Sequence, residues 1–309
     1  MDSNTKGQFE ATVLFNRPMR KCFNRMGLQF TGPGAEAFAK TRPGQFAQFD
    51  VSTVPLPPQD AIPEELRDIA AKNILLRRPF SFARVAKEDD KTIVEVIYCV
   101  LGPATLRMTT LAKGQSINLI GPLGNGFSIP QGKNKVILVA GGMGSPPLEH
   151  LAQMLSEESP NIDAIAFAGA KTKYNLPFER ILDKISQELG FWLGEFARYT
   201  FNSFVATDDG SAGYKGTVTN YLHEWFDNNG HNPDETIICA CGPKAMLANI
   251  AKLAAEKKID CLVSMEEMMA CGIGLCQSCA VKCRDEKGDE IYKLCCKDGP
   301  VFNAKDVVF

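Results

Sequence analysis

The sequence lacks a strong excess of charge of either sign. Its 34 Lys and Arg nearly balance its 36 Asp and Glu, which leaves a formal net charge of −2. No run of Lys or Arg forms a basic stripe. Proteins that bind nucleic acid or anionic membranes usually carry such a surface, so we expect neither as a partner.

Long apolar runs are also missing. The most apolar stretch, residues 136–148, is short and interrupted by Gly and Pro, whereas a membrane-spanning helix needs about 20 apolar residues. Residues 1–9 are polar and lack the apolar centre of a secretory signal. We therefore expect a cytoplasmic protein that does not span a membrane.

Histidine is scarce. The only three, His150, His223 and His231, lie outside any recognisable motif. A nucleophile activated by His, as in a Ser/His/Asp or Cys/His arrangement, is therefore not indicated. We expect no catalytic side chain, and any difficult chemistry would belong to bound cofactors.

Cysteine, in contrast, is abundant. The chain has 11, and six of them fall between Cys271 and Cys296. In a cytosolic chain of this length, such a number indicates metal or redox chemistry before disulfides.

The 309 residues suffice for two or three compact units. Residues 1–130 are expected to form an antiparallel β-barrel, because short alternating runs near residues 9–15, 46–51, 92–100 and 116–120 are bounded by Gly and Pro. Residues 55–73 interrupt this pattern and predict a loop with a short helix inserted in the barrel.

Residues 131–260 alternate strands with helices and predict an α/β domain with a parallel sheet. We expect strands at residues 135–140, 162–169, 201–207 and 236–241, and helices at residues 147–157, 178–189, 218–228 and 244–257. Residues 261–309 are rich in Cys and Gly. Fewer than 50 residues build a poor core unless a metal centre holds them together.

Cys271, Cys276 and Cys279 have the spacing C-x4-C-x2-C, which is the plant-type spacing for three ligands of a [2Fe-2S] cluster. Gly272 and Gly274 would let the loop turn sharply around the cluster. Spacing alone leaves the fourth ligand open among Cys283, Cys295 and Cys296. A structural zinc site is the main alternative, although zinc sites favour two separated C-x2-C pairs.

Two Gly-containing turns follow expected strands and precede expected helices. The first contains Gly141, Gly142 and Gly144, and the second is Cys241-Gly242-Pro243. A helix N-terminus offers free N–H groups to a pyrophosphate, and glycines allow its close approach. Because both turns end strands of one sheet, we expect them to meet at one crevice that binds a nicotinamide cofactor.

The expected barrel holds two candidates for flavin binding. Arg78, Pro79, Phe80 and Ser81 place a cation, an aromatic ring and a hydroxyl on one extended stretch. A second candidate, residues 102–106, includes Ala104 and Thr105 and would cradle a phosphate before a helix.

Taken together, these motifs resemble the ferredoxin-reductase superfamily and, more closely, the electron-transfer subunits of class 1B dihydroorotate dehydrogenases. The resemblance covers nearly the whole chain. It is carried by residues 78–81, 121–127, 139–144, 207–213, 241–243, 265–279 and 296–302. The last segment, Cys296-Lys-Asp-Gly-Pro-Val-Phe302, is the most specific, and in the family a Cys before x-D-G-P-V-F selects Cys296 as the fourth ligand.

The resemblance implies an FAD-binding barrel, an NAD-binding α/β domain and a small C-terminal [2Fe-2S] domain. It implies that Ile97, Tyr98 and Cys99 also line the FAD. It further implies NAD(H) and a partner, the FMN-containing catalytic subunit that oxidises dihydroorotate, in a heterotetramer. Ala104, where the family usually has Gly, and Ser145-Pro146-Pro147 depart from the pattern.

The expected function is electron transfer from the FMN subunit, through the cluster and FAD, to NAD+ in pyrimidine biosynthesis. The alternative is the same flavin and iron–sulfur module serving another NAD(P)-linked oxidoreductase, such as a sulfide or ferredoxin-linked one. Lys171 and Lys173 follow the second expected strand and leave NADP open, because they would suit a 2′-phosphate.

Overall fold

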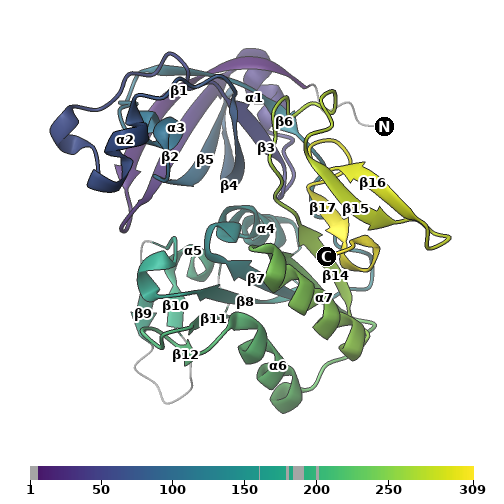
Figure 1. Cartoon of the computed structure of the whole chain (residues 1–309). Helices are drawn as coiled ribbons and strands as arrows, with labels where there is room; N and C mark the ends of the chain where they lie inside the picture. The colour runs from purple at the N-terminus through teal and green to yellow at the C-terminus, as the bar shows by residue number, and fades with distance from the viewer. Residues whose placement is uncertain (1–5, 160, 179–180, 184–190, 200–201) are drawn as a thin grey trace.

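A computed structural model describes residues 6–159, 161–178, 181–183, 191–199 and 202–309 (Figure 1). A β-barrel lies above an α/β domain in the view of Figure 1, and the C-terminal segment, in yellow, lies beside both. Among the described residues, no helix is long and apolar enough to cross a membrane.

The barrel is closed by six antiparallel strands in the order β1-β2-β5-β4-β3-β6. They are β1 (Gly7–Pro18), β2 (Phe23–Thr31), β3 (Phe46–Phe49), β4 (Arg78–Glu88), β5 (Lys91–Cys99) and β6 (Ser116–Leu123). Helix α1 (Gly32–Phe38) places Phe38 in the barrel core, where its ring stacks on Phe30 at 4.0 Å. Closure removes exposed strand edges, and the predicted antiparallel barrel is confirmed.

The predicted insert is present between β3 and β4. It contains η1 (Gln59–Ala61), η2 (Glu64–Leu66) and α2 (Arg67–Ala70). Ile62, Leu66 and Ala70 form a small apolar cluster with Leu106 of α3 (Pro103–Met108). The insert therefore lies against the helix that follows β5.

The α/β domain contains a seven-stranded sheet in the order β12-β11-β8-β7-β13-β14-β17. The strands are β7 (Lys135–Gly141), β8 (Asp163–Ala170), β11 (Asn202–Thr207), β12 (Tyr214–Lys215), β13 (Thr236–Cys241), β14 (Asp260–Ser264) and β17 (Val301–Asn303). The parallel core runs outward in both directions from the pair β7 and β13. In such doubly wound sheets, ligands bind where the strand order reverses, here between β7 and β13.

Helices cover both faces of this sheet. Helix α4 (Ser145–Glu158) packs on the face that includes Val136 and Leu138, whereas α6 (Val218–Asn229) and α7 (Lys244–Lys257) cover the face that includes Ile137 and Val139. Because alternate residues of β7 are buried on opposite faces, the strand is apolar throughout. The predicted parallel sheet is confirmed.

The helix expected at residues 178–189 is wrong where the structure describes this segment. Within residues 178–189, Ile181–Asp183 forms strand β9, which pairs with β10 (Phe191–Leu193); residues 179–180 and 184–189 lie outside the described residues. A short apolar run does not distinguish a helix from a strand. Helix α4 begins at Ser145, two residues before its expected start, with a proline in its first turn, where proline is favoured.

The C-terminal segment is attached to the sheet at both ends. Strand β14 extends the parallel sheet, and β17 pairs with it in antiparallel register, with Ser264 opposite Val301. Between them lie the Cys-rich loop and a hairpin of β15 (Ala280–Arg284) and β16 (Glu290–Leu294). The expected domain limit at residue 260 thus falls inside β14, and the division at residues 130 and 260 stays a prediction.

Candidate cofactor sites

The predicted cluster ligands form two adjoining pairs. The backbone N–H of Cys276 donates to Sγ of Cys271 at 3.4 Å, and the backbone N–H of Cys296 donates to Sγ of Cys279 at 3.4 Å. Such contacts stabilise thiolates and tune the potential of a bound cluster. Cys296, which follows β16, is therefore brought to the loop that carries the other three.

The two alternative fourth ligands are placed differently. The thiol of Cys295 donates to the backbone oxygen of Met265 at 3.3 Å and is fully buried. Cys283 lies on β15 and is also fully buried. Among the described residues, neither makes an N–H···S contact of the kind that joins Cys296 to Cys279, and Cys296 stays the predicted fourth ligand.

The backbone of the loop suits the wrapping of a cluster. Gly272 and Gly274 have φ values of +71° and +89°, which side-chain-bearing residues rarely adopt. In the described residues, no three His, Cys, Asp or Glu side chains converge on one point as ligands of a single metal ion do. The fit to a cluster rests instead on four thiols in one region and on N–H groups directed at their sulfurs.

The thiols at the site differ in acidity. Hydrogen bonds from the hydroxyl and N–H of Ser278, and then from Cys271, lower the pKa of the exposed Cys276 to about 6. Burial, together with the neighbouring Cys279, raises the pKa of Cys296 to about 12. Ligand binding requires thiolates, and the hydrogen bonds at Cys276 favour the thiolate of this predicted ligand.

The structure joins two motifs that the sequence left separate. Asn125, in the loop after β6, donates from Nδ2 to the backbone oxygens of Asp298 and Val301 at 3.0 and 2.9 Å. Its Oδ1 accepts from the N–H of Val301 at 2.9 Å. These hydrogen bonds hold the chain after Cys296 against the loop that follows β6, the last strand of the barrel. Sequence reasoning missed this contact, although both segments carried the family resemblance.

The two Gly-containing turns meet, as predicted. A Cβ added to Gly144 would lie 1.9 Å from the backbone oxygen of Cys241, and one added to Gly141 would lie 2.7 Å from Cδ of Pro243. Side chains are therefore excluded where the turns touch. Burial raises the pKa of Cys241 to about 12, so its thiol is neutral at pH 7.

A cavity of about 800 Å³ opens beside these turns. It is lined from the sheet by Gly141, Gly142 and Pro243 and from the barrel by Cys99. Glu65 and Leu66 of the insert also line it. The cavity thus extends from the place between β7 and β13 where the strand order reverses to the end of barrel strand β5. A ligand bound to the α/β domain would meet a ligand bound to the barrel there.

The predicted flavin residues lie on neighbouring barrel strands. Arg78–Ser81 begins β4, and Ile97, Tyr98 and Cys99 end β5. Thr105 accepts hydrogen bonds from the N–H groups of Leu101 and Gly102 at 3.0 and 3.2 Å. Its hydroxyl therefore caps α3, and Ala104 beside it is buried.

Two aromatic side chains of this set belong to the barrel core. Tyr98 is fully buried, and its hydroxyl donates to Oδ1 of Asn16 at 2.9 Å. The ring of Phe80 packs edge-on against Phe49 and Tyr98, with centroids 5.1 and 6.3 Å apart. The Tyr98 side chain is thus taken up in the barrel core, and the residue itself pairs with Asn24 of β2.

Lys171 and Lys173, the two lysines that would suit the 2′-phosphate of NADP, lie in different surroundings. Lys171 lines the cavity. Lys173 places Nζ over the ring of Tyr174, 5.3 Å from its centroid. Of these two lysines, Lys171 lines the cavity and Lys173 is not among its lining residues.

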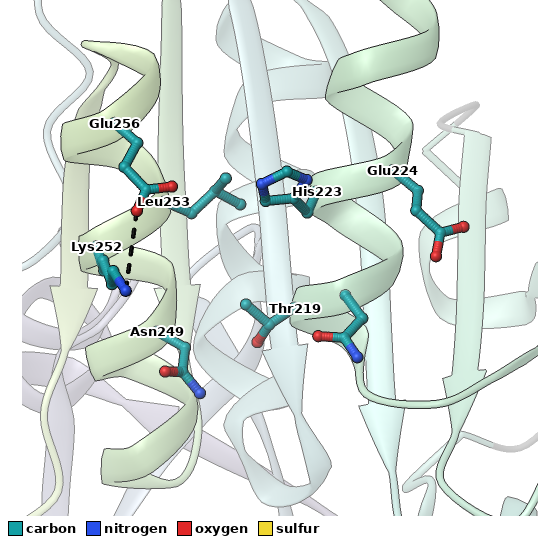
Figure 2. Close-up of a pocket in the computed structure, with 8 residues that line it drawn as sticks. Thr219, His223, Glu224, Asn249, Lys252, Leu253 and Glu256 are labelled. Carbon is teal, nitrogen blue, oxygen red and sulfur yellow. Dashed lines mark ion pairs between the residues drawn. The ribbon is translucent and has the colours of Figure 1, made fainter.

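A second hollow lies between α6 and α7 and is lined mainly by polar side chains. Figure 2 shows its walls, including Thr219, His223 and Lys252, and the exposed ion pair between Lys252 and Glu256 at 3.9 Å. No predicted site residue lines it. It contributes nothing to the arrangement of the two cofactor sites.

Models of two protein families match the chain. Residues 138–252 match the oxidoreductase NAD-binding domain, which includes both Gly-containing turns. Residues 266–308 match the iron–sulfur cluster binding domain of dihydroorotate dehydrogenase B, which includes all four predicted ligands.

Solved structures with the same fold include ferredoxin reductases. The structure of an NADH-dependent reduced ferredoxin-NADP oxidoreductase is 24% identical, has a TM-score of 0.70, and covers 96% of this chain and 89% of its own. A ferredoxin NADP+ reductase from Neisseria gonorrhoeae with bound FAD and NADP has a TM-score of 0.54 at 14% identity, covering 81% of this chain and 91% of its own. The fold is therefore that of the ferredoxin reductases.

Curated relatives match over almost their entire length. The dihydroorotate dehydrogenase B (NAD(+)) electron transfer subunit of Caldanaerobacter subterraneus subsp. tengcongensis is 32% identical over 98% of this chain and 99% of its own. The corresponding subunit of Geobacillus sp. (strain WCH70) is 33% identical over 97% and 98%. The chain therefore belongs to the family of electron transfer subunits of dihydroorotate dehydrogenase B.

Proposed function

We propose that the chain passes electrons from an FMN-containing catalytic subunit that oxidises dihydroorotate, through a [2Fe-2S] cluster and FAD, to NAD+. It would do so in the cytoplasm, in pyrimidine biosynthesis, as part of a heterotetramer. The observation that carries the proposal is the match to electron transfer subunits over 98% of the chain, with the iron–sulfur and NAD-binding regions both included.

We assign the cluster to Cys271, Cys276, Cys279 and Cys296. The two N–H···S contacts and the loop glycines support this set. A flavin can exchange electrons singly or as a hydride, so FAD could collect two single electrons from a [2Fe-2S] cluster and pass them to NAD+ as a hydride. The protein's part is to hold these centres in sequence and to keep water from the nicotinamide crevice.

The nicotinamide would bind between the turns that contain Gly141, Gly142 and Gly144 and residues 241–243. Support comes from their position at the switch point of the sheet and from the close contact between them. Cys99 lines the same cavity from the barrel. The residues assigned to FAD on β4, β5 and α3 (Arg78, Pro79, Phe80, Ser81, Ile97, Tyr98, Cys99, Ala104 and Thr105) would thus present the flavin to the nicotinamide.

The cluster loop is suited to contact with the catalytic subunit. Met268, Ile273 and Leu275 are 86%, 47% and 77% exposed, and all three belong to the loop that carries the ligands. Exposed apolar side chains grouped in one place are typical of protein interfaces. We therefore place the partner at this loop, which leaves the cluster as the point of electron entry.

Co-purification tests the proposal directly. The native complex is expected to contain iron, acid-labile sulfide, FAD and a second, FMN-containing protein, and to reduce NAD+ when dihydroorotate is added. A complex with flavin and cluster but without an FMN subunit would instead support a subunit of a different NAD(P)-linked oxidoreductase.

Paired cysteine variants test the ligand assignment. We expect Cys296→Ser to abolish the electron paramagnetic resonance signal of the reduced cluster, because a ligand is lost. Cys295→Ser is the matched control and should keep the signal, since the Cys295 thiol is hydrogen-bonded to Met265. The opposite pattern would overturn the assignment.

A further inference from the structure

Gln48 is a buried polar residue on the side of the barrel that faces the cluster loop. It lies in β3, opposite Pro79 of β4 and Ile120 of β6. Its strand neighbours Ala47 and Phe49 point into the barrel core, whereas Phe46 packs with the apolar cluster that includes Cys279 and Cys296. Because side chains alternate along a strand, Gln48 shares the outward side with Phe46.

The carboxamide of Gln48 has no protein partner among the described residues. Its side chain is fully buried, and neither Nε2 nor Oε1 makes a hydrogen bond within the part of the chain that the structure covers. A buried polar group left unpaired costs about 1–3 kcal/mol. An apolar side chain of similar size would fill the space without that cost, so packing alone does not explain a glutamine here.

The amide is pressed against the cluster loop. A Cβ added to Gly272 would lie 2.5 Å from Nε2 and 2.6 Å from Cγ of Gln48. Gly272 directly follows the predicted ligand Cys271 and has a φ of +71°. The glycine therefore permits the main chain beside the first ligand to come into contact with the Gln48 side chain.

Gln48 also connects the loop to the expected flavin segment. Its pairing partner, Pro79, belongs to the stretch Arg78–Ser81 on β4. The same residue thus contacts the cluster loop through its side chain and the flavin segment through its strand. A hydrogen bond donated by the Gln48 amide would therefore reach a bound cluster from the barrel side.

We propose that Gln48 is a positioning residue for the cluster, whose Nε2 group donates a hydrogen bond to a sulfur at the Cys271 side of the site. The inference rests on the proposed function, because it requires a cluster held by this loop. A hydrogen bond to sulfur stabilises the reduced form, which carries more negative charge, and so raises the reduction potential.

The test is a redox titration of the native complex, followed by electron paramagnetic resonance of the cluster. In Gln48→Leu we expect the one-electron equilibrium to shift about tenfold toward the oxidised cluster, which corresponds to about 59 mV. Gln48→Glu should shift it further in the same direction, because it replaces the donor with a carboxylate. Gln59→Leu, in the insert, changes an exposed glutamine and should leave the potential unchanged.

Stability separates this role from a structural one. Gln48→Leu fills the same space with an apolar side chain that needs no hydrogen-bond partner, so we expect it to unfold no more readily than the wild type while its cluster potential falls. An unchanged potential in both Gln48 variants would overturn the proposal. If Gln48→Leu loses its cluster, Gln48→Met, of similar length but without a hydrogen-bond donor, is titrated instead, and an unchanged potential there overturns the proposal too.

The failure of the proposed function would look different. In that case the wild-type protein itself would show no cluster signal, or its cluster would not be reduced by dihydroorotate through the partner. A wild-type signal with normal reduction, and variants with an unaltered potential, would remove only the role of Gln48.

Discussion

Two of the contacts between the barrel and the rest of the molecule are built in contrasting ways. At the first, the α4 contact, charged side chains of Arg25 and Glu95 in the barrel meet Glu149 of α4. At the second, the motif contact, the amide of Asn125 binds main-chain groups of residues 298–301. One depends on charge between side chains, and the other on a neutral side chain and backbone.

The α4 contact is a buried ionic network. Nη2 and Nη1 of Arg25 donate to the two carboxylate oxygens of Glu149 at 2.6 and 3.2 Å, and Nε donates to Glu95 at 2.6 Å. Arg25 is 1% exposed and Glu149 is fully buried. Burial raises the pKa of Glu149, and Arg25 opposes that effect. Such pairs add little net stability, yet they are costly to break.

The α4 contact also includes hydrogen bonds between a side-chain amide and the main chain. The side chain of Gln153 accepts from the N–H of Val85 at 3.1 Å and donates to its carbonyl at 2.6 Å. A helix residue thus pairs with barrel strand β4 as a neighbouring strand would. Together with Arg25, this fixes α4, and with it the first Gly-containing turn, relative to the barrel.

The motif contact depends on the close approach of the loop after β6 to the main chain of residues 298–301. A Cβ added to Gly124, with φ of +74°, would lie 2.7 Å from Cδ of Pro300. The N–H of Asn125 donates to the backbone oxygen of Gly299 at 2.6 Å. The comparison teaches that the nicotinamide side is positioned by specific charges, whereas the cluster side is positioned by the shape of two loops.

Breaking the ionic network should have the largest effect. Arg25→Met removes both short hydrogen bonds to the buried Glu149 and leaves it only the longer pairing with Arg198 at 3.9 Å, so we expect the free energy of unfolding to fall by about 3–5 kcal/mol. Urea unfolding followed by circular dichroism measures it. The exposed pair of Lys252 and Glu256 (Figure 2) is the control, and Lys252→Met should cost only a few tenths of a kcal/mol. Equal losses in the two variants would contradict the contrast.

Acid should destabilise the protein through His150, a buried residue of α4. Burial lowers the pKa of His150 to about 3, whereas it is about 6.5 in an unfolded chain. Between these values the unfolded state binds more protons, so stability falls as the pH drops below about 6.5. The loss should reach about 2 kcal/mol at pH 5, since each pH unit is worth about 1.36 kcal/mol.

His150→Gln provides the measurement for this effect. The variant should lose less stability than the wild type between pH 7 and pH 5 in urea unfolding. His223→Gln, a change at a half-exposed histidine of α6, should retain the full pH dependence. An identical pH profile for His150→Gln and the wild type would show that this histidine does not titrate on unfolding.

Loosening the motif contact should have the smallest effect on stability. Asn125→Ala removes three hydrogen bonds at a partly exposed site, and we expect a loss of about 1–2 kcal/mol. The cluster should bleach faster in air, because the chain that carries Cys296 is held less firmly. Asn228→Ala, on the exposed surface of α6, is the control. A bleaching rate equal to that of the wild type would separate this contact from cluster retention.

The sequence predicted features that depend on local pattern. The barrel strands, the parallel sheet and the meeting of Gly144 with Cys241 follow from alternation, glycine and strand order. The choice of Cys296 over Cys295 needed the family motif, because adjacent cysteines have the same spacing to within one residue. A run such as Ile181–Asp183 is too short to show whether its apolar residues follow a helical or a strand period. The sequence therefore predicts a helix where the structure has a strand.

Contacts between distant side chains could not be predicted. Arg25 and Glu149 are 124 positions apart, and each is a single charged residue in an ordinary strand or helix pattern. The unpaired amide of Gln48 likewise has no signature, because only the folded chain brings Gly272 against it. Such features arise from tertiary packing, which no local pattern encodes.

The pairing of β14 with β17 has a consequence for how this protein could be engineered. Because Ser264 and Val301 lie opposite each other, the chain leaves the sheet and returns to it at almost the same point. The two ends of the Cys-rich segment between these strands are therefore held side by side in the sheet. An engineer could exchange this segment between the two fixed points without changing the order of the strands.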